Sequence, residues 1–421
     1  MSAAVQKFLF LIFLIFASSC SFVGLQKDID QLDTLSVVSG SVTKHSGSTD
    51  PILVALYRQK ADDEYELGSY SVLYGAGDFE LTSDPGKFYL IAFEDKNQDF
   101  SLQRDEFIGW YGGPTLLTIK PGENYPGRNL LLRSPDQAEV ELPELYAPGA
   151  PQILLSIENV RLGDVVEQSD PIFASENGQM GMWNPVKFFE QGKTGIFFLE
   201  AYDPTKVPVL FVHGLTGTGQ DWEQVIYSMD RTRFQPWIMQ YPSALRLDLL
   251  GKTLNNAVKE LQIRHKFKDL IVVAHSMGGL IARKFINENA SQNNKEVVKL
   301  FVSIATPWKG HEGAQIGISH APAVVPSWYD LAPNSPFLNS LLDQPLPDHV
   351  SYYLFFAHQN TNGFLSPDNS DGTVTIRSQL SDDAQAQANR IIGIDENHSS
   401  ILRSKTMTDK LVNIFNSTIN R

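Results

Sequence analysis

The sequence is poor in cysteine, in basic residues and in long apolar stretches, and each shortage argues against a class of protein. Cys20 is the only cysteine in 421 residues, which excludes an intrachain disulfide. The 34 Lys and Arg residues are outnumbered by 48 Asp and Glu residues, giving a net charge of −14. This balance argues against a nucleic-acid-binding protein, because phosphate neutralisation needs clustered cations. The apolar run over residues 8–16 is too short to span a bilayer.

The chain nevertheless has ample material for folded domains. Hydrophobic residues make up 42% of the sequence and include 25 Phe, so burial of apolar surface can offset the loss of chain entropy. A length of 421 residues predicts two or three domains.

Residues 1–19 have the pattern of an export signal, in which Lys7 precedes the apolar run and small residues lead to Cys20. A cysteine in this place resembles the lipobox of bacterial lipoproteins, where it becomes the acylated first residue of the mature protein. The resemblance implies that Cys20 carries a lipid anchor and that the protein lies in the cell envelope. The following Ser21 suggests the outer membrane, facing the periplasm or the surface. The alternative is ordinary cleavage near Ser18, which would release the exported protein without an anchor.

Residues 20–133 alternate short apolar runs with turn residues, which predicts a β-sandwich of about seven strands. The strand rhythm resembles transthyretin-like and carboxypeptidase-regulatory-like modules. Residues 134–152 contain four prolines and are expected to form a stiff linker.

One stretch of this β domain invites a calcium hypothesis. Asp95, Asn97, Asp99 and Glu106 occupy positions that resemble the oxygen ligands of a twelve-residue calcium loop. Phe100 stands where such loops take glycine, so a solvated acidic turn is the alternative, and we assign no metal or other cofactor.

Residues 153–421 predict an α/β domain. The continuous apolar runs 209–212 and 270–274 suit buried parallel strands, and residues 250–261 place apolar side chains on one face of a helix. Strands that alternate with helices predict a mostly parallel sheet covered on both faces.

The run Ala274-His275-Ser276-Met277-Gly278-Gly279 lies between a predicted strand and a predicted helix. It resembles the nucleophile elbow of α/β-hydrolases, where small residues permit a strained turn that exposes the serine. The resemblance implies the α/β-hydrolase fold of the lipase and esterase branch, with Ser276 as nucleophile. His275 is expected to point away from the nucleophile.

The same family places an acid and then a histidine after the nucleophile. Asp371 lies in a D-G-x-V turn and His398 follows a predicted strand, so they are the expected acid and base, with Asp368 as the other candidate acid. The pair His213-Gly214 resembles the oxyanion loop, which implies that the backbone amides of Leu215 and Met277 bind the substrate oxygen.

Residues 310–350 form a long connection and are expected to be a lid, in which the aromatic side chains could line an acyl pocket: Trp308 just before it, and Trp328, Tyr329 and Phe337 within it. We therefore expect a membrane-anchored serine hydrolase of carboxylic, lipid or acyl esters. The alternatives are an acyltransferase or amidase with the same triad, and a non-catalytic surface binding protein. The expected partners are an ester substrate and the membrane, and the oligomeric state stays open.

Overall fold

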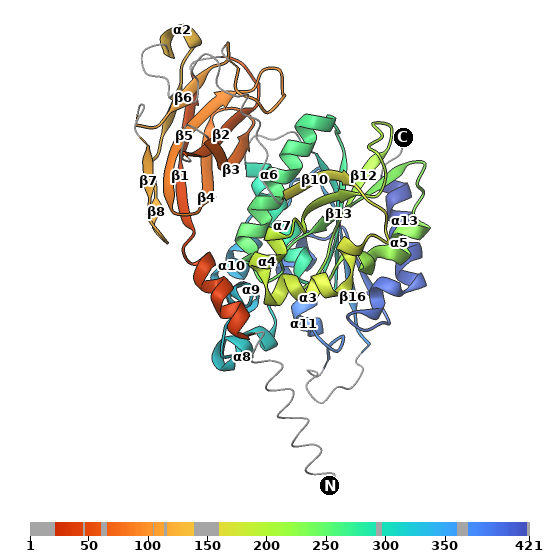
Figure 1. Ribbon diagram of the computed structural model, residues 1–421. Coiled ribbons are helices and arrows are strands. Elements are labelled where there is room, and N and C mark those ends of the chain that lie inside the picture. The colour runs from red at the N-terminus through yellow and green to blue at the C-terminus, as the bar shows by residue number, and fades with distance from the viewer. Residues whose placement is uncertain are drawn as a thin grey trace.

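The structure, a computed structural model, describes residues 22–418 except 45–46, 60–64, 104, 113–115, 139–159, 292–296 and 360–368. The predicted signal segment, Cys20, Asp368 and most of the predicted linker lie outside the described residues. A helix over residues 22–32 comes first, an all-β region follows, and a larger part is built around an eight-stranded sheet (Figure 1). Among the described helices, none combines the length and the apolar character needed to cross a membrane.

The all-β region consists of two sheets that share one hydrophobic cluster. Side chains from both sheets enter it, including Val38 of the first sheet and Val54 of the second. The first sheet contains β1 (Ser36–Lys44), β4 (Gly77–Ser83), β8 (Asn124–Tyr125) and β9 (Leu130–Leu132). The second contains β2 (Ile52–Gln59), β3 (Tyr65–Leu73), β5 (Gly86–Glu94), β6 (Ile108–Trp110) and β7 (Leu117–Ile119). The described residues thus form nine strands in this region, where the sequence predicted about seven.

The large sheet has the strand order β10-β11-β13-β12-β14-β15-β16-β17. Neighbouring strands are parallel except for the pair β11–β13. The strands are β10 (Val160–Val165), β11 (Thr194–Phe198), β12 (Val207–Val212), β13 (Phe234–Gln240), β14 (Leu270–His275), β15 (Val298–Ile304), β16 (Ser351–Ala357) and β17 (Arg390–Ile394).

Helices cover both faces of this sheet, which explains its continuous apolar strands. Leu210 and Val212 of β12 pack in a cluster with α6 (Leu247–His265) and α7 (Met277–Ser291). The alternate residues Val209 and Phe211 pack on the other face with α5 (Glu223–Ser228) and α13 (Lys405–Thr418). Successive side chains of a strand point to opposite faces, so a sheet buried on both sides needs apolar residues at every position. The predicted fold class, a mostly parallel sheet with helices on both faces after an all-β region, is confirmed.

The all-β region rests on helix α6. Ile263 of α6 is buried in a cluster of side chains from β2 and β5, and Lys259 Nζ donates a hydrogen bond of 2.8 Å to the carbonyl oxygen of Val72. Tyr74 Oη donates to Gln262 Oε1 at 2.9 Å. The two parts therefore meet in a packed interface along one helix.

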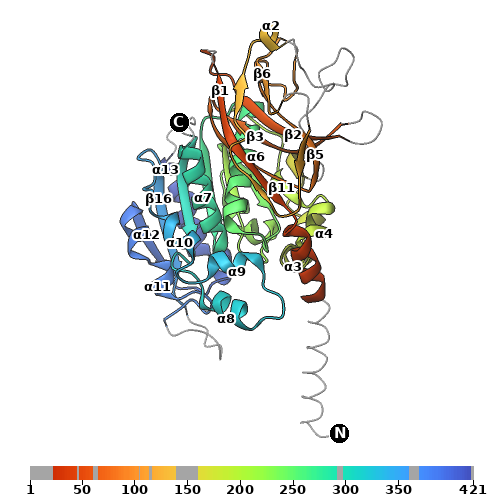
Figure 2. The same cartoon turned by 90° about the vertical axis from the view of Figure 1, so that its left-hand side faces the viewer.

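Shorter helices lie around the large sheet (Figure 2). They are α3 (Ser175–Trp183), α4 (Pro185–Glu190), α8 (Glu312–His320), α9 (Pro326–Leu331), α10 (Pro336–Leu341), α11 (Ile376–Gln379) and α12 (Asp382–Gln387). Three of them, α8, α9 and α10, make up most of the predicted lid. Asp330 of α9 accepts hydrogen bonds from the Arg246 guanidinium at 2.7 and 3.0 Å and from the Leu247 N–H at 2.7 Å. These contacts fasten α9 to the start of α6.

Candidate active site

Ser276 lies on a sharp turn between β14 and α7, with a backbone φ of +52°. The close packing of this turn explains its small residues. A Cβ atom on Gly278 would lie 2.4 Å from the carbonyl oxygen of His213, and one on Gly279 would lie 2.0 Å from Thr306 Oγ1. A non-glycine residue with positive φ is strained, and such strain persists where the surroundings impose it. The turn holds the Ser276 hydroxyl at the carboxyl edge of the sheet, as the resemblance implied.

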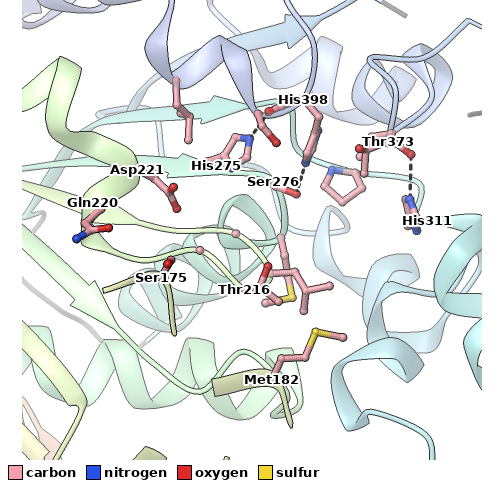
Figure 3. A pocket seen from close by; sticks show the side chains of 18 of the residues that line it. Ser175, Met182, Thr216, Gln220, Asp221, His275, Ser276, His311, Thr373 and His398 are labelled. Carbon is pink, nitrogen blue, oxygen red and sulfur yellow. Dashed lines mark hydrogen bonds between the residues drawn. The ribbon is translucent and has the colours of Figure 1, made fainter. Parts of the chain in front are cut away.

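His398 and Asp371 meet at this hydroxyl (Figure 3). His398 Nε2 lies 2.8 Å from Ser276 Oγ, and His398 Nδ1 lies 2.7 Å from Asp371 Oδ2. His398 follows β17, and Asp371 lies in the connection after β16. The structure thus brings together the three side chains chosen from the sequence, although 95 residues separate Ser276 from Asp371 along the chain.

The carboxylate of Asp371 is buried and accepts four hydrogen bonds. Its Oδ1 accepts from the backbone N–H groups of Thr373 at 3.0 Å and Val374 at 2.7 Å. Its Oδ2 accepts from His398 and, at 3.1 Å, from Gln379 Nε2. An ionised carboxylate is a pure acceptor, so this set of donors suits it. No motif in the sequence marks Gln379, which lies in the short helix α11.

Two further histidines flank the nucleophile and support it structurally. His275 Nε2 lies 2.9 Å from the carbonyl oxygen of His398, so the ring, which was expected to point away from Ser276, lies against the backbone of the base. Burial lowers the pKa of His275 to about 3. His213 is stacked on Tyr241 with 4.1 Å between ring centroids, and burial lowers its pKa to about 4. Both rings are therefore neutral at pH 7.

The predicted oxyanion residues lie beside Ser276. Leu215 and Met277 both line the cavity that contains the hydroxyl. Met277 is the first residue of α7, so its N–H has no acceptor within the helix and carries the positive end of the helix dipole. A Cβ atom on Gly214 would lie 2.9 Å from the Cβ atom of Ser276, so only glycine lets the Leu215 loop come this close.

The cavity has a volume of about 1040 Å³ and is lined by both polar and apolar side chains. Figure 3 shows Ser276 and His398 on one side and Met182 opposite them. Trp328 and Leu331 of α9 also line it. Of the four aromatic residues expected to line an acyl pocket, only Trp328 does so: Trp308 and Phe337 are in the core, and Tyr329 is on the surface.

Within the described part of the chain, no group of three or more His, Cys, Asp or Glu side chains is placed to hold a metal ion. The candidate calcium loop is held by its own backbone. Asp95 accepts from the N–H groups of Asp99 and Phe100, each at 3.1 Å. Glu106 accepts from those of Lys96 and Gln103, each at 2.9 Å. Asp95 and Glu106 are buried, whereas the alternative to the calcium hypothesis was a solvated turn, so calcium binding stays a prediction.

Residues 246–322 match the family model described as "Alpha/beta hydrolase of unknown function (DUF915)". No curated protein matches the chain. Among solved structures, it is similar to the mature form of the lipase BlEst2 of Bacillus licheniformis, with 22% identity over 53% of this chain and 98% of that chain and a TM-score of 0.41. A gene product of Listeria innocua (lin2722) shares 14% identity over 51% of this chain and 96% of that one, with a TM-score of 0.39. Phospholipase PlaB of Legionella pneumophila shares 17% identity over 42% and 46% of the two chains, with a TM-score of 0.35.

The family match spans helix α6, the strand before Ser276, the turn itself and helix α7. Together with the eight-stranded sheet and the strained turn that carries Ser276, this match supports the α/β-hydrolase fold for residues 153–421.

Proposed function

We propose that the protein is a serine hydrolase that cleaves carboxylic esters through an acyl-enzyme on Ser276. The observation that carries the proposal is the continuous series of hydrogen bonds from Ser276 Oγ through His398 to Asp371, at one end of a cavity. A serine hydroxyl is a weak nucleophile until a neighbouring base removes its proton.

The reaction follows from these positions. Ser276 Oγ attacks the ester carbonyl carbon while His398 Nε2 takes the hydroxyl proton, and Asp371 stabilises the imidazolium that forms. The N–H groups of Leu215 and Met277 bind the oxyanion of the tetrahedral intermediate. The C–O bond to the alcohol then breaks, and the alcohol leaves with the proton from His398. Water, deprotonated by the same base, attacks the acyl-enzyme and releases the acid.

The cavity supports an ester with an apolar acyl group. Met182, Leu215, Trp328 and Leu331 present hydrophobic side chains to it. Apolar walls with a few converging polar groups are typical of sites that bind hydrophobic small molecules.

We also propose that the mature protein begins at Cys20 and is held in the cell envelope by its lipid. Two or more acyl chains bind a membrane stably, at about 0.8 kcal/mol for each buried methylene. A Cys20→Ala variant should move from the membrane fraction to the soluble fraction. A variant that stays with the membrane would contradict the anchor.

The hydrolase proposal is tested with p-nitrophenyl esters of increasing acyl length and with a fluorophosphonate probe. The wild type should hydrolyse the esters and react with the probe, and Ser276→Ala should do neither. Ser340→Ala, which changes an exposed serine of α10, is the matched control and should behave as wild type. An unlabelled wild type would contradict the proposal and favour the non-catalytic binding protein. Adding an alcohol acceptor and measuring the new ester separates a hydrolase from an acyltransferase.

A further inference from the structure

The helix over residues 22–32 packs behind the wall of the catalytic cavity. Its apolar residues Phe22, Leu25 and Ile29 lie on one face, and Leu25 is fully buried. This face packs in a hydrophobic cluster that also contains Met182, Leu215 and Trp328. These three residues line the cavity at Ser276, so the helix supports the cavity from behind.

Further contacts fix the helix in place. The Phe22 ring meets the Trp183 ring edge to face, with 5.3 Å between centroids. Asp28 Oδ2 accepts a hydrogen bond of 3.1 Å from the N–H of Val186, near the start of α4. The helix is therefore docked on the part of the chain that contains the large sheet.

The helix begins at the end of the molecule that carries α8, whose residues Gly313 and Ala314 line the cavity. Figures 1 and 2 place its first residues and α8 at the same end, opposite the outer strands of the all-β region. In the sequence only Ser21 separates Phe22 from Cys20, the proposed lipid anchor. A membrane that holds this anchor must therefore lie close to this end.

The three most exposed large hydrophobic side chains of the described residues lie on the cavity lining, on the docked helix and on α8. They are Tyr227, Val23 and Ile316, which are 89%, 71% and 62% exposed. Tyr227 lines the cavity, Val23 lies on the docked helix, and Ile316 lies on α8, whose residues Gly313 and Ala314 also line the cavity. Val23 and Ile316 lie on two elements that share one end of the molecule, and exposed apolar side chains in one region indicate a contact with an apolar partner.

We propose that this end of the molecule, marked by Val23 and Ile316, is a membrane-contacting surface, and that the docked helix holds the adjacent cavity close to the bilayer that contains Cys20. The proposal rests on the proposed anchor and the proposed hydrolase function. It commits the enzyme to ester lipids that enter the cavity from that same bilayer.

The contact can be measured without activity, because the sulfur of Cys20 is blocked by lipid and the chain has no other cysteine. Ile316→Cys and, as control, Leu131→Cys on β9 of the all-β region are labelled with a fluorophore. Each lipidated protein is reconstituted in phosphatidylcholine vesicles that contain doxyl-labelled phosphatidylcholine. We expect the label at 316 to be quenched and the label at 131 to stay bright. An unquenched label at 316 on protein that floats with the vesicles overturns the proposal, and so does a chain that does not float.

An activity measurement separates this proposal from the proposed function. Ile316→Glu should leave hydrolysis of the water-soluble p-nitrophenyl acetate unchanged and reduce hydrolysis of an ester lipid in the vesicles by about tenfold, because a charged side chain opposes contact with the bilayer. Leu131→Glu should change neither rate. Equal rates of Ile316→Glu and wild type on the vesicle lipid overturn the membrane contact, whereas a wild type inactive on both esters contradicts the hydrolase function.

Discussion

His275 Nε2 lies 2.9 Å from the backbone carbonyl oxygen of His398, so the residue before the nucleophile binds the backbone of the base. A carbonyl oxygen only accepts, and burial keeps His275 neutral, so Nε2 carries the proton and donates. The backbone N–H of His398 donates in turn to the carbonyl oxygen of Asp371 at 2.9 Å. Both backbone groups of the base are thereby fixed.

We therefore expect His275 to act as a positioning residue. His275→Phe keeps a ring but removes the donor, and leaving a buried acceptor without a partner costs about 1–3 kcal/mol. The kcat on p-nitrophenyl butyrate should fall about tenfold or more while KM changes little. His275→Gln, which keeps a donor, should recover part of the loss. An unchanged kcat in His275→Phe would show that the hydrogen bond does not position the base.

The orientation of the base should depend on Asp371. Asp371→Asn places an amide where four donors converge, which favours the wrong tautomer of His398, and kcat should fall by about 10⁴-fold. Asp368→Asn is the matched control and should stay near wild type. The opposite result, with Asp368→Asn inactive and Asp371→Asn active, would assign the acid to Asp368.

Glu260 should make the stability of the protein depend on pH. It is 2% exposed on α6, and burial raises its pKa to about 7, against the opposing effect of Arg264. A carboxyl group with a higher pKa in the folded than in the unfolded state loses its stabilising contribution as pH rises through the folded pKa. The free energy of unfolding of Glu260→Gln, relative to that of wild type, should increase as pH rises from about 5 to 7. The increase should be at most about 1.4 kcal/mol per pH unit. Urea midpoints of both proteins at each pH give the difference, and a constant difference would refute the prediction.

The adjacent Lys259 should show the opposite trend. Burial lowers its pKa to about 7, so the unfolded chain binds more protons between about pH 7 and 10, and stability rises with pH in that range. The stability of Lys259→Met relative to wild type should be greatest below about pH 7 and should decline toward pH 10. The same urea titrations measure it, and no decline would contradict burial of the charge.

Asp330 should determine how firmly α9 is held, and with it the cavity residues Trp328 and Leu331. Asp330→Ala removes the acceptor of the Arg246 guanidinium and of the buried Leu247 N–H, which should cost about 1–3 kcal/mol of unfolding free energy. Because Trp328 and Leu331 lie on the same helix, KM should rise more for long-chain than for short-chain esters. Arg246→Ala should cost less, since half of that side chain is in water. Equal losses in the two variants would contradict this account.

The parts of the fold that the sequence predicted are those whose causes are local. Val209 to Val212 read as one apolar run because both faces of β12 are covered, and the small residues around Ser276 follow from a turn of a few residues. Order along the chain and the D-G-x-V turn favoured Asp371 and His398, with Asp368 as the other candidate acid. Such residues can meet because the carboxyl ends of parallel strands lie at one edge of a sheet.

Other parts depend on contacts that no local pattern reveals. Strand β13 is hydrogen-bonded to β11 on one side and to β12 on the other, and it contains Pro236. A proline in the sequence argues against a central strand. The helix over residues 22–32 has only Phe22, Leu25, Ile29 and a few other apolar side chains, and the prediction grouped it with the β domain. Its partners Met182, Ala244 and Val325 are more than 150 residues away along the chain. His275 turns toward His398 because the carbonyl of the base lies within its reach, which only the folded chain establishes.

The docked helix has a consequence for kinetics once Cys20 carries its lipid. Two residues, Cys20 and Ser21, form the whole tether, and two extended residues span at most about 7 Å. Such an enzyme searches for substrate in two dimensions. Its turnover would follow the mole fraction of the ester in the lipid leaflet and the lateral diffusion that delivers it, and would be insensitive to the amount of the same ester dispersed in the surrounding water.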